Sequence, residues 1–161
     1  MSAIRDDELL IERTFDAPPA LVFRLWEDRD HVIRWWGPEG FTATELDWSL
    51  TPGCPWHGAM ASQEYGVSRF GGVIREVVKN RRIVFTFRWL SDQTDDIETL
   101  VSVDFAERDG KTIQTFHQAP FANLASRDSH VGGWNSLFNK QRTYFENFAV
   151  AEREITPAPR K

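Results

Sequence analysis

The sequence predicts an α+β fold in which a curved, seven-stranded antiparallel sheet holds a long C-terminal helix across its concave face. Three observations predict it. Apolar residues recur with a helical period of about 3.6 residues over 125–150, and with a strand period of about 2 over most of 41–118. The predicted strands are joined by hairpin-length turns, which imply antiparallel neighbours, and a strongly twisted sheet of this size curls.

The first third of the chain predicts one strand and two short helices. Apolar and polar residues alternate over 8–15, and Pro18-Pro19 follows this strand. Because proline is tolerated in a first helical turn, a helix is expected over 19–27. A second short helix is expected over 28–36, and Gly37-Pro38 ends it.

The central part predicts six strands that form a meander. In the third of these six strands, Gly71-Gly72 suggests a bulge or a bend. A polar loop is expected over 91–96, and Asp109-Gly110 is a strong hairpin signal. The expected strands are 41–50, 56–64, 67–78, 82–90, 97–106 and 111–118.

The C-terminal helix is expected over about 125–150, with Asp128 or Ser129 as its N-cap. Its apolar residues recur in steps of three and four, so they share one stripe. A helix with so many aromatic side chains is not stable alone in water, and the concave face of the sheet supplies its partner. The stripe consists of Val131, Trp134, Phe138, Phe145 and Phe148.

Length and composition limit the possible classes of function. A chain of 161 residues predicts one domain, over 8–152, with flexible termini at 1–7 and 153–161. The net charge of -5, without a Lys/Arg cluster, argues against nucleic-acid binding. The single cysteine, Cys54, excludes an intramolecular disulfide and is typical of a reducing cytoplasm. No apolar run reaches the length of a membrane span, so a cytoplasmic protein is expected.

Short motifs along most of the chain resemble one protein family. The matching segments are 11–18 (IERTFDAP), 34–38 (RWWGP), 52–56, 70–72 (FGG), 82–86 (RIVFT), 115–117 (TFH) and 133–135 (GWN). Over roughly residues 8–149 the sequence resembles the activator of heat-shock-protein-90 ATPase homologue family, within the START/Bet v 1-like (SRPBCC) superfamily. The resemblance implies the helix-grip fold. It does not fix the activity, because this fold hosts ligand carriers, cyclases, hydrolases and chaperone regulators.

Two features of the sequence depart from the family pattern. Cys54-Pro55 replace a glycine and a basic residue before Trp56, and Pro55 has no N–H for a strand ladder. Gln141 replaces a leucine on the stripe of Trp134 and Phe138. A buried amide there needs hydrogen-bond partners or loses ~1–3 kcal/mol.

The candidate polar residues of a site are His117 and Gln141. His117 shares its strand parity with Ile113 and Thr115, which we assign to the concave face. It is then either a general acid/base or ligand contact close to Gln141, or a hydrogen-bonded structural histidine. The four histidines show no metal-ligand spacing, and no phosphate-binding loop or other cofactor motif is present, so no metal and no cofactor are expected.

Seven Trp and twelve Phe suggest a heavily aromatic core or a ring-lined cavity. The leading hypothesis is a non-catalytic protein that encloses a small apolar or aromatic ligand, with Trp35-Trp36 as a pocket wall or only a plug of the core. Two alternatives are a chaperone-regulating interaction domain of the stress response, which the resemblance implies, and a cyclase- or hydrolase-type enzyme that uses His117. The expected cavity residues are Trp35, Trp36, Trp48, Trp56, Phe85, Phe87, Trp89, His117, Trp134, Phe138 and Gln141.

Overall fold

The computed structural model describes residues 5–90 and 97–155, with side chains through residue 148. The predicted loop 91–96 and the outer parts of the predicted flexible termini, 1–4 and 156–161, lie outside the described residues. In chain order the elements are β1 (Leu9–Phe15), α1 (Pro19–Glu27), α2 (Arg29–Trp35), β2 (Thr42–Asp47), β3 (Pro55–Ser62), β4 (Gly66–Val78), β5 (Arg82–Trp89), β6 (Thr99–Arg108), β7 (Lys111–Ala119) and α3 (Leu124–Ile155).

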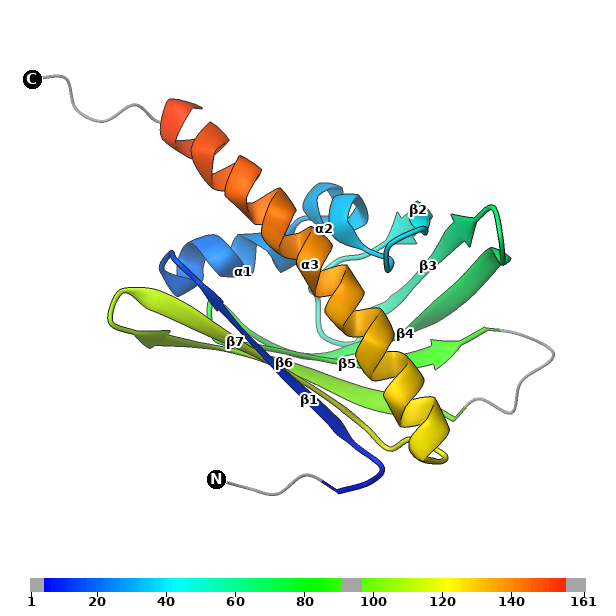
Figure 1. Cartoon of the computed structure of the whole chain (residues 1–161). Coiled ribbons are helices and arrows are strands. Elements are labelled where there is room, and N and C mark those ends of the chain that lie inside the picture. The colour runs from blue at the N-terminus through cyan, green and yellow to red at the C-terminus, as the bar shows by residue number, and fades with distance from the viewer. Residues whose placement is uncertain (1–4, 91–96, 156–161) are drawn as a thin grey trace, which may run out of the picture.

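The seven strands form one antiparallel sheet in the order β1-β7-β6-β5-β4-β3-β2. The strand that begins the fold therefore pairs with the last one, and Leu9 lies opposite Gln118. Figure 1 shows the sheet curling around α3, which crosses its concave side, while α1 and α2 lie beside the later turns of α3. This arrangement confirms the predicted helix-grip fold. Among the described residues, no helix is both long and apolar enough to cross a bilayer.

Gly71 and Gly72 do not form a bulge; the register shift in β4 falls later, between Ile74 and Glu76. The two glycines instead allow close approach of neighbouring strands. A Cβ on Gly72 would overlap the carbonyl oxygen of Thr86, and one on Gly71 would lie 2.7 Å from the carbonyl oxygen of Trp56. The predicted bulge at these glycines is therefore wrong, and close strand packing requires glycine there.

The N-cap of α3 differs from the prediction. The helix begins at Leu124, and the side chain of Asn123 accepts a hydrogen bond from the backbone N–H of Ser126 at 2.8 Å. Asn123 is therefore the N-cap, whereas the predicted caps Asp128 and Ser129 lie inside the helix. The predicted start of the helix at about residue 125 is thus within one residue of the observed start, and only the cap assignment is wrong.

Gln141, the polar residue on the apolar stripe of α3, is fully buried and paired. Its Oε1 accepts from Gln114 Nε2 at 3.0 Å, and its Nε2 donates to Gln114 Oε1 at 3.3 Å. Gln114 Oε1 also accepts the indole N–H of Trp26 at 2.9 Å. The buried amide thus finds the partners that it needs, and the pair ties α3 to β7 and α1.

Candidate ligand-binding pocket

A pocket of about 450 Å³ opens between the first turns of α3, the loop after α2, and strands β3 to β5. Its volume falls within the ~300–1,000 Å³ typical of small-molecule sites. Three walls enclose it, and each comes from a different part of the chain. The lining residues are Trp36, Pro38, Phe41, Met60, Tyr65, Ser68, Phe87, Trp89, Ser129, His130, Gly133, Trp134 and Leu137.

The loop wall begins where α2 stops at Trp35. Trp36 caps the helix with an extended backbone, and Gly37 follows with φ of 99°, which glycine adopts without strain. Two bonds hold the loop against α3. Ser136 Oγ accepts from the backbone N–H of Glu39 at 2.7 Å, and Lys140 Nζ donates to the carbonyl of Phe41 at 3.1 Å. Burial lowers the pKa of Lys140, and the charge of Glu39 partly opposes this shift.

The helix wall follows from residue spacing on α3. Ser129, Gly133 and Leu137 are four residues apart, so they lie above one another on the face that lines the pocket. A Cβ built on Gly133 meets no atom within 4 Å. The missing side chain therefore leaves part of the pocket open, whereas neighbouring positions on the same helix wall carry bulky side chains.

Buried polar groups fix the orientation of Trp134, which lines the same wall. Its indole N–H donates to Gln118 Oε1 at 2.7 Å. Gln118 Nε2 in turn donates to Thr99 Oγ1 at 2.8 Å, and Thr99 Oγ1 donates to the carbonyl of Phe87 at 3.0 Å. Gln118 and Trp134 are both buried. Because every donor in this series of hydrogen bonds has an acceptor, the Trp134 ring is held in place before any ligand binds.

His130 and Trp89 form the far end of the pocket. Trp89 donates its indole N–H to His130 Nε2 at 2.9 Å, and His130 Nδ1 lies 2.7 Å from the carbonyl oxygen of Ser126. An indole can only donate, so Nε2 is the acceptor and Nδ1 carries the proton. Both ring nitrogens are thus engaged. A smaller space of about 40 Å³ shares Phe87, Trp89 and His130 with the pocket.

Two rings stand at the mouth. Phe41 and Tyr65 stack with their centroids 6.1 Å apart and their planes 4° from parallel. Tyr65 lies in the turn between β3 and β4 and is 70% exposed. Neither ring was predicted for the site, because only the folding of the β3–β4 hairpin towards the α2 loop brings them together.

A family model for "Activator of Hsp90 ATPase homolog 1-like protein" matches residues 16–146. The chain belongs to this family. Among proteins with curated descriptions, none is significantly similar in sequence.

Solved structures of several bacterial proteins share the fold. One, from Chromobacterium violaceum, has a TM-score of 0.79 at 21% identity and covers 88% of this chain and 99% of its own. The AHSA1 protein of Silicibacter pomeroyi gives 0.78 at 24% identity, with coverage of 89% and 99%. An AHSA1-like protein of Aeromonas hydrophila gives 0.72 at 20% identity, with coverage of 88% and 94%. At these identities the likeness concerns the fold alone.

In this family member the structure divides the nine predicted Trp and Phe rings of the cavity into two groups, and Gln141 does not line the pocket. Trp36, Phe87, Trp89 and Trp134 line the pocket. The remaining rings belong to the packed core and do not line the pocket. Two of their N–H groups bond to the backbone, Trp48 to Trp26 and Trp56 to Thr86. The core rings are Trp35, Trp48, Trp56, Phe85 and Phe138.

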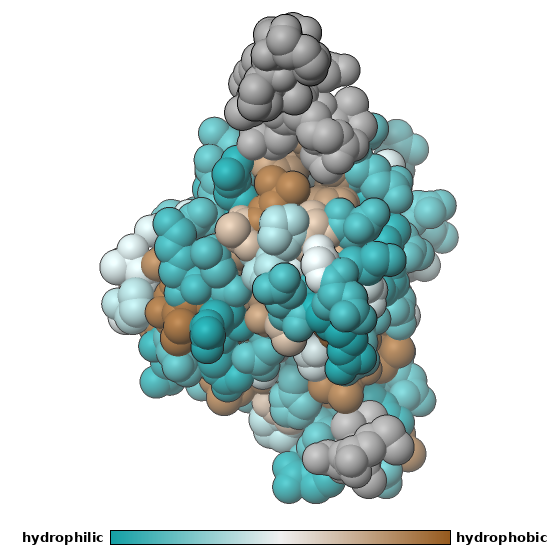
Figure 2. All heavy atoms as spheres, turned by 90° about the vertical axis from the view of Figure 1, so that its left-hand side faces the viewer, coloured by the Kyte–Doolittle hydropathy of each residue, from teal (hydrophilic) through white to brown (hydrophobic). Residues whose placement is uncertain are grey.

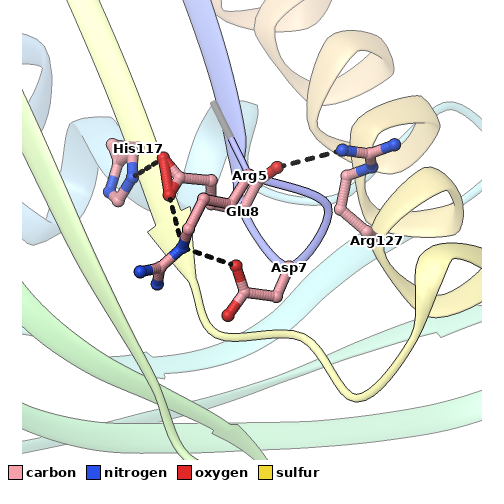
Figure 3. A network of polar contacts seen from close by, with 5 residues as sticks. All are labelled: Arg5, Asp7, Glu8, His117 and Arg127. Carbon is pink, nitrogen blue, oxygen red and sulfur yellow. Dashed lines mark hydrogen bonds and ion pairs between the residues drawn. The ribbon is translucent and has the colours of Figure 1, made fainter. Parts of the chain in front are cut away.

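The assignment of His117 to the concave face is wrong. The residues of β7 that face the helix are Thr112, Gln114, Phe116 and Gln118, all buried, so His117 lies on the opposite, convex face. Its side chain is 36% exposed, and Nε2 lies 3.3 Å from Glu8 Oε1. Figure 3 shows this contact within a surface network that also contains Arg5, Asp7 and Arg127. His117 and Gln141 are therefore on different sides of the sheet.

No metal centre is evident in the part of the chain that the structure describes, where no group of three or more His, Cys, Asp or Glu side chains is arranged to hold an ion. The pocket instead offers aromatic faces and the hydroxyl-bearing side chains of Tyr65, Ser68 and Ser129. This arrangement can bind and orient a flat molecule.

Proposed function

We propose that this protein binds a small, mainly apolar or aromatic ligand in the pocket between α3 and the loop after α2. One observation carries the proposal. A space of about 450 Å³ remains open among rings whose orientations are already fixed by hydrogen bonds and ring contacts. Rigid ring-lined walls reduce the entropy that is lost when a ligand binds, and such walls favour flat apolar molecules.

Gly133 allows a sharp test. In Gly133→Leu the new side chain extends from the helix wall into the open space, since its Cβ meets nothing within 4 Å. Gly132 is the matched control, because a Cβ there also meets nothing within 4 Å and the residue does not line the pocket. Both substitutions raise helix propensity by a similar amount, so any difference between them reports on the pocket.

The probe is the neutral dye 1-N-phenylnaphthylamine, whose fluorescence rises in an apolar environment. The wild-type protein and Gly132→Leu should bind it with the same affinity. Gly133→Leu should weaken binding about tenfold or more, equivalent to ~1.4 kcal/mol. Equal binding by all three proteins would place the dye elsewhere and refute the proposal. Native mass spectrometry of the purified protein then searches for the natural ligand.

A chaperone-regulating function is the second candidate, and family membership is the observation that favours it. Protein-binding surfaces commonly expose a contiguous apolar patch of several hundred Å². On the face shown in Figure 2, apolar residues form small, separate groups within a mainly hydrophilic surface. Measuring the ATPase rate of purified heat-shock protein 90 with and without this protein tests the idea, and an unchanged rate counts against it.

A further inference from the structure

Trp36 differs from the other tryptophans in its hydrogen bonding. Among the described residues, the indole N–H groups of the other six have protein acceptors, whereas Trp36 Nε1 has none. The residue is only 3% exposed. Within the same described part of the chain, no buried side-chain nitrogen or oxygen lacks a partner. Trp36 Nε1 therefore keeps access to open space, and the space that Trp36 lines is the pocket.

The Trp36 ring is held rigidly, so its N–H has a fixed direction. Phe70 stacks on it, with centroids 5.5 Å apart and planes 27° from parallel. Trp56 and Trp134 meet it edge to face at centroid distances of 5.7 and 5.5 Å. A donor whose rotamer is already fixed loses little entropy when it bonds to a ligand.

The pocket is also poor in charge. Its lining includes no Lys, Arg, Asp or Glu side chain among the described residues. His130 is the one titratable ring in the helix wall, and both of its nitrogens are engaged, one by Trp89 and one by the carbonyl of Ser126. An ion that enters would lose its hydration without gaining a counter-charge, which is strongly unfavourable.

We infer that the pocket selects uncharged aromatic molecules that carry a hydrogen-bond acceptor such as a carbonyl oxygen, and that Trp36 Nε1–H donates to this acceptor. The inference rests on the proposed function and defines its ligand class. An acceptor at this position would complete the one tryptophan N–H for which the described residues supply no partner, while the ring-lined walls contact the faces of the ligand.

Three naphthalene probes separate the contributions. 2-Acetylnaphthalene carries a carbonyl group, 2-isopropenylnaphthalene replaces that oxygen by a methylene group of similar shape, and 2-naphthoate adds a negative charge. The wild-type protein should bind the ketone about tenfold more tightly than the alkene, equivalent to ~1.4 kcal/mol. The carboxylate should bind more weakly than the ketone.

The decisive variant carries 3-benzothienylalanine in place of Trp36, because sulfur then replaces the N–H group and the shape of the ring is kept. The ketone and the alkene should bind to this variant with equal affinity. The same replacement at Trp48, whose N–H bonds to a backbone carbonyl in the core, is the control and should preserve the preference for the ketone. In proton–nitrogen correlation spectra of the wild-type protein, the ketone should shift the Trp36 indole resonance more than the alkene does.

The possible failures can be told apart. If neither neutral naphthalene binds, the pocket function and the inference fail together. If both bind equally well to the wild-type protein, the pocket function stands and the role of Trp36 is overturned. A preference for the ketone that survives in the Trp36 variant, or tightest binding by 2-naphthoate, overturns the inference in the same way.

Discussion

Replacing Gln141 by leucine tests how the buried amides hold α3 on the sheet. Gln141 and Gln114 are both fully buried and bond to each other through both amide groups, at 3.0 and 3.3 Å. In Gln141→Leu, the amide nitrogen of Gln114 loses its acceptor, while the Gln114 oxygen still accepts from Trp26. An orphaned buried donor costs ~1–3 kcal/mol. A shift of ~2–4 °C in Tm per kcal/mol then predicts a Tm lower by about 2–12 °C.

The assays are thermal unfolding, which gives Tm, and urea unfolding, which gives the free energy, both monitored by circular dichroism. They are applied to the two single variants and to the double variant Gln114→Leu/Gln141→Leu. The double variant removes both amides and leaves only the Trp26 N–H without its acceptor. It should therefore lose less free energy of unfolding than the sum of the single losses. A Gln141→Leu protein as stable as the wild type, or strictly additive losses, would show that the amide pair contributes no mutual stabilisation.

Two further predictions concern glycine and tyrosine. Gly132→Ala should raise the free energy of unfolding by ~0.5–1 kcal/mol, because glycine is unfavourable in a helix and the new Cβ meets no atom within 4 Å. Gly72→Ala should lower the free energy of unfolding, because the new Cβ overlaps the carbonyl of Thr86. Equal urea midpoints for the two variants would contradict both expectations. Burial raises the pKa of Tyr144. The variant Tyr65→Phe leaves Tyr144 as the single tyrosine, so a pH titration of its phenolate absorbance should have a midpoint above ~10. Because the folded state favours the neutral phenol, the free energy of unfolding should fall as the pH rises from ~10 towards the raised pKa. A phenolate titration midpoint below ~10 would refute the raised pKa.

The arrangement of helices and strands follows from hydrophobic periods that the sequence shows directly. These periods do not show which face of β7 contacts the helix. The helix-facing residues include three polar side chains, Thr112, Gln114 and Gln118, whereas apolar Ile113 faces outward. Each buried polar group is compensated by a specific partner in another element or loop. Polarity alone therefore assigned the wrong face of this strand to the helix, and with it the wrong place for His117.

The pocket was predictable in kind but only partly in detail. A surplus of rings and the RWWGP segment indicated a ring-lined wall, and Trp36 and Trp134 are part of it. Whether a ring packs in the core or lines the pocket depends on how far α1 and α2 fill the concave face. No local sequence pattern encodes this. A glycine within an aromatic helix is compatible with close approach or with open space, and the structure shows that Gly133 leaves space.

The pairing of β1 with β7 has a consequence for biosynthesis. Leu9 finds its strand partner only at Gln118, so the edge of the sheet stays incomplete until most of the polypeptide has been made. Contacts this distant in sequence slow folding, and an unpaired strand edge invites association with other chains. A nascent chain that has left the ribosome only as far as β6 carries β1 without its neighbour, and this interval is when the protein is most exposed to aggregation.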